Sequence, residues 1–165
     1  MRAGFVALSF LLMLCACETK KGLALKKISA LESQLLQLDD TAKNRPLAQE
    51  VLIEYDAFIQ TYPDSEETPD LLFKSGEVLK GMGAYLKSAK AFHKVYSQFP
   101  NTKVAPIALF QQAHCFESLD QRATAKKSYE TFIERYPNHA YIDQAKGMIK
   151  MLHLSDEELI DQFQN

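Results

Sequence analysis

The sequence has too few cysteines for a disulfide-stabilised fold and too little net charge for a nucleic-acid-binding protein. Among its 165 residues there are only three cysteines, at positions 15, 17 and 115, and there is no tryptophan. The 19 basic and 21 acidic side chains give a formal charge of -2, so no basic excess draws the chain to phosphates. Six glycines and six prolines in a chain that is 47% hydrophobic exclude collagen-like and low-complexity classes. What remains is a globular chain, long enough to bury roughly 68–70% of its unfolded surface without a metal or disulfide.

The first residues have the pattern of a secretory leader. Arg2 supplies a positive charge, and Phe5–Leu14 forms a nearly unbroken apolar run. This run is too short to span a bilayer as a helix, which needs about 20 residues, but it matches the apolar core of a signal peptide. We therefore predict that residues 1–16 are a signal peptide.

The leader ends in Leu14-Cys15-Ala16-Cys17, which resembles the lipobox of bacterial lipoproteins. The resemblance implies cleavage before Cys17 and a covalent diacylglycerol and N-acyl lipid on this cysteine, with no other cofactor. Cys15 fits less well because a bulky leucine precedes it, and ordinary cleavage that leaves Cys17 as a free thiol is the alternative. Glu18 is not the aspartate that typically retains lipoproteins in the inner membrane. The expected location is therefore the outer membrane, facing the periplasm, with residues 17–22 as a lipidated tether.

A pair formed by an aromatic residue and a proline recurs with a period of 37 residues, as Tyr62-Pro63, Phe99-Pro100 and Tyr136-Pro137. Apolar or small residues precede each pair at offsets of four, seven and eleven, which trace one stripe of a helix. After the first two pairs, helical spacing is repeated by Leu72, Gly76 and Leu79 and by Leu109, Ala113 and Phe116. Each period therefore predicts two amphipathic helices.

These positions resemble the signature of the tetratricopeptide repeat (TPR), a helix-turn-helix of 34 residues. The resemblance implies that small residues such as Gly76 and Ser88 let paired helices approach closely. Each proline ends the second helix because it lacks an N–H and clashes with the preceding turn. The three additional residues per period are assigned to the loops at 64–67 and 101–103. We expect an all-α, TPR-like α-solenoid of antiparallel helix pairs, each buried against its neighbours.

The helical domain is expected over residues 23–165, with the core repeats at about 46–152. Nothing alternates with a two-residue period, so no sheet is expected. Gly81-Met82-Gly83 is predicted to form the turn within the central repeat, and Ser155-Asp156-Glu157-Glu158 a capping box that opens a short last helix. The other helices are predicted at 23–38, 46–61, 67–82, 84–98, 103–118 and 122–135, and from about Tyr141.

The helix at 23–38 carries a short apolar stripe with 4-3-4-3 spacing: Ala24, Ile28, Leu31, Leu35 and Leu38. This spacing fits a helix that caps the first repeat, and it also fits a brief coiled-coil seam. Four lysines flank the stripe and fit either a solvated tether or contacts with anionic lipid headgroups: Lys20, Lys21, Lys26 and Lys27.

Patterns that support catalysis or metal binding are sparse. The four histidines form no HxxxH or HExxH motif, and no CxxC is present to complete a zinc site. His114 and Cys115 are adjacent, but neighbours on a helix point about 100° apart, so Cys115 is expected to pack as a small hydrophobe beside Phe116. The sequence also has no GxSxG elbow and no glycine-rich phosphate loop. We predict that the protein is not an enzyme and holds no metal.

The first helix of each TPR pair lines a concave groove, and the resemblance implies that this groove binds a peptide or protein partner. Helical spacing places Phe73, Glu77 and Lys80 on a face displaced from the core stripe. Two aromatic side chains flanked by charges suit a binding hot spot, although both aromatics equally fit packing between repeats. The groove residues expected are Asp70, Phe73, Glu77, Lys80, Ile107, Phe110, His114 and Glu117.

Together, the lipobox and the short repeats resemble two groups of envelope proteins: the BamD family and the TPR domains of the YbgF/CpoB family. The first implies a lipid-anchored scaffold in outer-membrane protein assembly, and the second a factor that coordinates the cell envelope during division. A cell-wall hydrolase that uses His114 with Glu117, one helical turn apart, is a third and remote possibility. In the first two cases the partners are proteins, not nucleic acid, and the chain is expected as a monomer in a larger complex.

Overall fold

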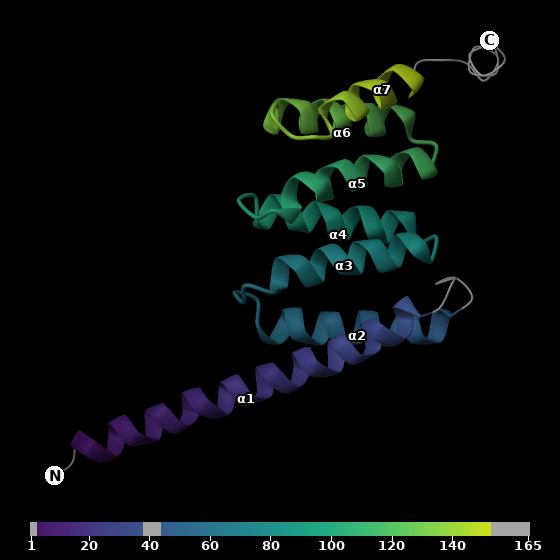
Figure 1. The fold of residues 1–165 in the computed structure, drawn as a ribbon. Helices are drawn as coiled ribbons and strands as arrows, with labels where there is room; N and C mark the ends of the chain where they lie inside the picture. The colour runs from purple at the N-terminus through teal and green to yellow at the C-terminus, as the bar shows by residue number, and fades with distance from the viewer. Residues whose placement is uncertain (1–2, 38–43, 153–165) are drawn as a thin grey trace. The chain divides into compact units, whose positions relative to one another are not determined.

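The structure, a computed structural model, describes residues 3–37 and 44–152, and within these ranges every regular element is an α-helix (Figure 1). The predicted all-α helical-repeat fold is confirmed. Contacts divide the chain into two compact units, Met1–Thr68 and Pro69–Asn165, which are described separately below. The helices are α1 (Ala3–Leu36), α2 (Arg45–Thr61), α3 (Thr68–Gly81), α4 (Tyr85–Gln98), α5 (Val104–Ser118), α6 (Arg122–Arg135) and α7 (Ile142–Leu152).

The first helix is longer than predicted. It begins at Ala3 instead of Leu23, and it continues through the expected leader and tether. These residues include no proline, and apolar and lysine side chains sustain a helix well, so no local signal ends it there. The predicted capping box at 155–158 lies outside the described residues. The side chain of Cys17 also lies outside the described part, and its lipidation stays a prediction. None of the described helices is long and apolar enough to cross a membrane.

In the first unit, α1 packs against α2 through the predicted stripe. Ile28 and Leu31 are buried, as are Val51 and Tyr55 on α2. The Tyr55 hydroxyl donates a hydrogen bond of 2.6 Å to Glu32 Oε1, which links the two helices. The stripe therefore forms the inner face of α1 within the first unit, where it packs against α2.

The three loops that follow the aromatic–proline pairs have the same backbone hydrogen bonds, 37 residues apart. The aromatic residue of each pair donates its N–H to the carbonyl four residues earlier, at 2.8–2.9 Å. Three residues later a second N–H returns to the carbonyl of that aromatic residue, at 3.0–3.2 Å. The three loops are therefore structurally equivalent, and the matching residues are Tyr62, Phe99 and Tyr136.

The turns inside the repeats are also equivalent. Gly83 has φ +74° and Asp120, 37 residues later, has φ +55°. At both turns one N–H bonds to the carbonyl five residues earlier and the preceding N–H to the carbonyl three residues earlier, at 2.8–2.9 Å. This is the Schellman arrangement, which needs one residue in the left-handed region. Glycine adopts this conformation without strain, and aspartate is among the few residues that tolerate it.

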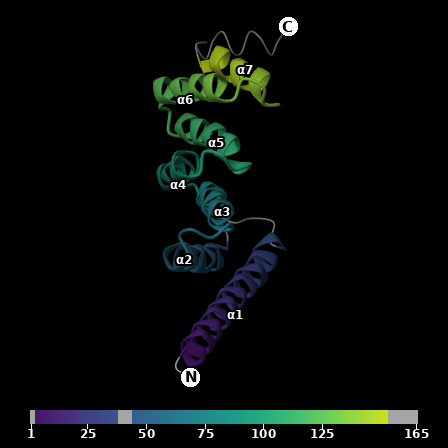
Figure 2. The ribbon, with the colours of Figure 1, turned by 90° about the vertical axis from the view of Figure 1, so that its left-hand side faces the viewer.

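In the second unit the helices form two layers. Figure 2 shows α4 and α6 on one side and α3, α5 and α7 on the other. The layers meet at small residues, as the repeat predicted: Ser88 is buried and its hydroxyl donates to the Gly76 carbonyl at 2.7 Å. A Cβ added at Gly76 would lie only 2.5 Å from Cε1 of Phe92. No larger residue fits between α3 and α4 at this point.

Cys115 is fully buried between α5 and α4. Its thiol lies 3.2 Å from the Ser88 hydroxyl, and burial raises the pKa of the thiol above its ordinary value. The residue therefore packs in the core, as predicted, and the neighbour that it contacts across the helix pair is Ser88.

Candidate partner-binding groove

A pocket of about 540 Å³ opens on the side of the second unit formed by the first helices of the repeats. Its walls come from α3, α4, α5 and α7, together with Tyr141, which directly precedes α7. The pocket is therefore formed where successive helix pairs stack. It is lined by Lys80, Gly81, Tyr85, Phe110, Gln111, His114, Ser118, Tyr141 and Gln144.

Three of the predicted groove residues line this pocket: Lys80, Phe110 and His114. Glu77 and Glu117 lie beside it, because each forms an ion pair with one of the lining side chains. Phe73 does not reach it. Its half-buried ring packs on Phe92 with the centroids 5.4 Å apart. The pocket therefore lies on the helix face that carries Lys80, Phe110 and His114, and Phe73 lies outside its lining.

Lys80 is held across two helices at the edge of the pocket. Its Nζ donates to Gln111 Oε1 at 2.8 Å and lies 3.1 Å from Glu77 Oε1. The Glu77 side chain is 40% exposed as a whole, yet Oε1 itself is enclosed, with this ammonium as its neighbour. An ammonium group has three donors, so Lys80 retains donor capacity toward a bound partner.

His114 is oriented by the carboxylate of Glu117. The Nδ1 of the imidazole lies 2.8 Å from Glu117 Oε2, and the Tyr129 hydroxyl donates to the same oxygen at 2.8 Å. The Phe110 ring meets the imidazole edge-on at 5.0 Å. Because a carboxylate oxygen accepts from Nδ1, the proton of a neutral His114 lies on that nitrogen, and Nε2 is its acceptor.

Of the two interpretations of Phe110, packing between repeats is the one that its burial favours. The ring is only 3% exposed and lies within 5.4 Å of the rings of Tyr129, Phe132 and Tyr141. It fills the space between α5, α6 and α7, so it contributes an edge to the pocket floor and belongs chiefly to the core. A Phe110→Ala substitution would therefore test folding before it tested binding.

Sequence reasoning missed Tyr141, Gln144 and Gln111 as pocket residues. The repeat offered a signal for Gln144, because this position lies 37 residues after Ile107 and 74 after Asp70, both expected in the groove. Tyr141 had no such signal, since its equivalent at position 104 is valine. Its ring is 40% exposed and contacts both Phe110 and His139.

Within residues 3–37 and 44–152, no three His, Cys, Asp or Glu side chains come together as metal ligands. The pair suggested for hydrolysis, His114 and Glu117, is present, but Glu117 Oε2 also accepts from Tyr129. The nearby Ser118 hydroxyl donates to the His114 carbonyl at 3.1 Å and not to the imidazole. This arrangement orients His114 as a surface donor or acceptor.

The repeated helix pairs define a helical-repeat protein, a class whose stacked units create extended concave binding surfaces. Residues 70–102 and 107–139 each match the family model described as Tetratricopeptide repeat. These matches span most of the pairs α3–α4 and α5–α6, so the second unit contains two helix pairs of the tetratricopeptide-repeat type, and such repeats typically serve as protein-interaction scaffolds. A comparison with curated proteins finds no match.

Proposed function

We propose that this chain is a non-catalytic, lipid-anchored TPR scaffold that binds partner proteins at the periplasmic face of the outer membrane. The observation that carries the binding step is the convergence of Lys80, His114 and Gln144 from three helices on one pocket. Donors and acceptors on a curved surface suit an extended or helical segment of a partner protein. The anchor rests on the lipobox-like Leu14–Cys17.

For the biological role, we propose participation in outer-membrane protein assembly, in the manner of the BamD family. The support is the pairing of a lipobox-like leader with short TPRs. Depletion of the protein tests this role: loss of β-barrel proteins from the outer membrane is expected. Normal barrel levels with chained cells would contradict it and favour the division role of the YbgF/CpoB type.

The groove is tested with side chains that are accessible, which excludes Phe110. A photo-reactive residue at position 144, on the rim of the pocket, is expected to cross-link to a partner in intact cells. Lys80→Glu combined with Gln144→Arg should remove that partner from co-purification.

A matched control places the same changes on the other layer: Lys127→Glu combined with Gln121→Arg on and before α6, both exposed. The control should retain the partner. If both double variants retain the partner while folding normally, the groove does not bind it.

A further inference from the structure

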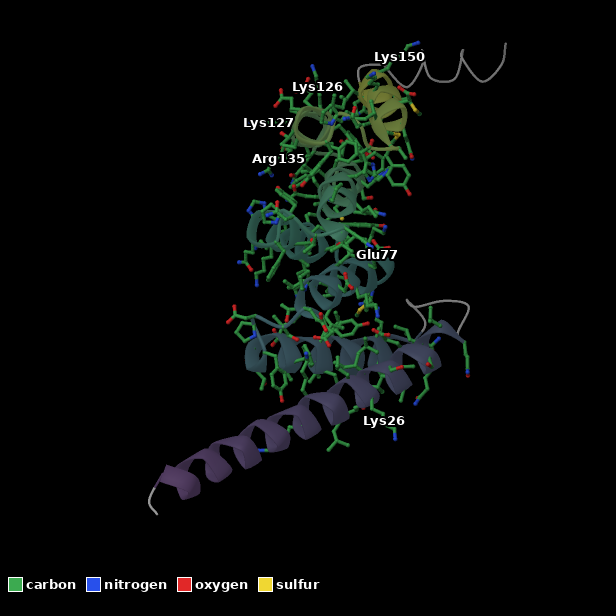
Figure 3. All side chains as sticks on the ribbon, turned by 60° about the vertical axis from the view of Figure 1, so that its left-hand side comes forward. Lys26, Glu77, Lys126, Lys127, Arg135 and Lys150 are labelled. Atoms are coloured by element: carbon green, nitrogen blue, oxygen red, sulfur yellow. The ribbon has the colours of Figure 1, made fainter. Side chains whose placement is uncertain are left out.

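The layer formed by α4 and α6 is strongly basic on its outer side. Helix α4 carries three lysines and no carboxylate, and α6 carries four basic and two acidic side chains. The opposite layer is balanced, since α3 has two lysines and two carboxylates. In Figure 3, Lys126, Lys127 and Arg135 lie on one side of the second unit and Glu77 on the other. The basic charge is therefore concentrated away from the groove.

A second pocket, of about 390 Å³, opens on this basic side between α4 and α5. Leu86, Ala89 and Phe116 give it apolar walls, and Lys90, His93 and Lys94 surround them. Leu86 is 52% exposed, so the apolar wall that it forms is open to a ligand. On α5, Phe116 points about 120° away from Phe110, so this pocket and the groove lie on different faces of the helix.

The polar groups at the base of this pocket are already satisfied. Gln112 Nε2 donates to the Ala89 carbonyl at 3.3 Å, and its Oε1 accepts from the Tyr96 hydroxyl at 2.8 Å. Tyr96 has then used its single proton, so the His93 Nδ1 at 2.8 Å must be the donor to that hydroxyl. A ligand that enters the pocket therefore meets no unpaired buried donor or acceptor at its base, and such a base suits an apolar side chain of the ligand.

The three lysines of α4, of which Lys90 and Lys94 line the pocket, have no acidic partners among the described residues. No carboxylate in that part of the chain forms an ion pair with Lys87, Lys90 or Lys94. All three are exposed. Arg135 extends the positive surface, because its guanidinium lies 5.7 Å above the Tyr96 ring. An apolar pocket surrounded by uncompensated cations complements an acidic ligand with an apolar anchor.

We propose that this basic face, defined by Leu86, Lys90, His93, Lys94 and Phe116, is a second binding site that receives an acidic segment of a partner protein. One large apolar side chain of the segment occupies the pocket, and flanking carboxylates pair with the lysines. The site is separate from the groove, so the scaffold holds two partners, or two parts of one partner, at the same time.

A protein segment fits this face better than a lipid headgroup or a nucleic acid. Phosphate ligands are recognised by charge and hydrogen bonds, and they leave an apolar pocket without a function. An amphipathic acidic segment uses the apolar walls and the cations together.

The test uses the full chain in a mild non-ionic detergent and a fluorescent synthetic peptide with glutamates around a central Leu-Phe pair. Anisotropy should show binding that weakens as salt is added, because exposed charges are screened. Replacement of Leu-Phe by Ser-Ser in the peptide should abolish binding. Lys90→Glu combined with Lys94→Glu should weaken it by about tenfold or more.

The matched control is Lys146→Glu combined with Lys150→Glu on α7, which changes the net charge equally at exposed positions. It should bind the peptide as wild type does, and the groove variant Lys80→Glu with Gln144→Arg should bind it too. Equal weakening by the α7 and α4 variants would overturn the site, since only net charge would then matter. Retained binding of the Ser-Ser peptide would overturn the apolar anchor.

Other occupants give different results. Oligothymidylate and short-chain phosphatidylglycerol are tested as competitors of the peptide. If either one displaces the peptide and binds more tightly than the peptide through Lys90 and Lys94, the proposal is overturned in favour of a polyanion or a lipid. Native mass spectrometry tests for a second copy of the chain as the occupant. If the wild type is a dimer and the Lys90→Glu, Lys94→Glu variant is a monomer, the face binds a second copy of the chain and the proposal is overturned.

Discussion

The Tyr129 hydroxyl on α6 donates a hydrogen bond of 2.8 Å to Glu117 Oε2 on α5. Tyr129 is fully buried, and the same carboxylate oxygen holds His114 at the groove. The contact therefore joins the packing of one repeat to the orientation of a side chain that lines the pocket. A hydrogen bond of the same kind in the first unit joins Tyr55, which is equivalent to Tyr129 in the repeat, to Glu32.

Removal of this hydroxyl should lower stability moderately. Tyr129→Phe keeps the ring but deletes the donor, and we expect a loss of about 1 kcal/mol in the free energy of unfolding, because Glu117 retains its contact with His114. Urea unfolding followed by circular dichroism measures it. Tyr141→Phe is the control, since its hydroxyl has no hydrogen-bond partner in the described ranges. Equal losses in both variants would contradict the role of the Glu117 contact.

Stability should fall in alkaline solution above pH 10. Burial, and then the hydrogen bond to a carboxylate, raise the pKa of both Tyr129 and Tyr55 above the ordinary value of 10.0. Above pH 10 the unfolded chain releases these protons while the folded chain keeps them, so unfolding becomes more favourable. Each tyrosine should contribute a slope of about 1.4 kcal/mol per pH unit. The contribution is fully present below pH 10.

Urea unfolding at several pH values tests this dependence. The Tyr55→Phe, Tyr129→Phe variant should lose less stability between pH 9 and about pH 11 than the wild type, because lysines titrate in both proteins and cancel in the difference. Parallel curves for the two proteins would show that neither phenol is protected.

Two helical glycines should respond in opposite directions to alanine. Gly76→Ala places a Cβ 2.5 Å from the Phe92 ring, and we expect a loss of about 1–3 kcal/mol from overpacking. Gly147, in α7, has nothing within 4 Å of an added Cβ, so Gly147→Ala should stabilise by roughly 0.5–1 kcal/mol through helix propensity. Thermal unfolding compares them. A stabilising Gly76→Ala would show that α3 and α4 separate easily.

Substitutions at the two turn residues with positive φ should change the free energy of unfolding in opposite directions. Asp120→Gly should stabilise by about 0.5 kcal/mol, because it relieves the left-handed conformation at φ +55°, whereas Gly83→Ala should cost about 1 kcal/mol. The Asp120–Arg122 ion pair lost in the first variant is exposed and contributes little. Asp120→Ala is the control and should destabilise. Identical effects of glycine and alanine at 120 would exclude backbone strain as the cause.

Sequence periodicity predicted the helices of the repeats well, because their limits are set locally. A proline or a left-handed residue ends each helix, and the predicted limits from 46 to 135 agree with the structure within one or two residues. Close approach at Gly76 and Ser88 followed from side-chain size alone. Only the start of α1 differed widely, since nothing in residues 3–22 ends a helix.

The exposure of a groove residue was less predictable, because it depends on the next helix in the stack. Phe73 and Phe110 occupy equivalent positions, yet one is half-buried and the other almost completely buried. The difference arises from Tyr141, whose ring lies 5.2 Å from Phe110. The pocket on the basic face was missed for a similar reason: it needs Leu86 from one helix and Phe116 from another, and no single helix pattern reveals their proximity.

The buried thiol of Cys115 is a probe of local opening between α4 and α5. A thiol reagent reaches Cys115 only when α5 separates from α4, because the side chain has no exposed surface and lies against Ser88. With Cys15 and Cys17 absent or blocked, the labelling rate in native buffer reports how often that junction opens. This junction also carries the walls of the basic-face pocket, so a partner bound there should slow the labelling without touching the sulfur.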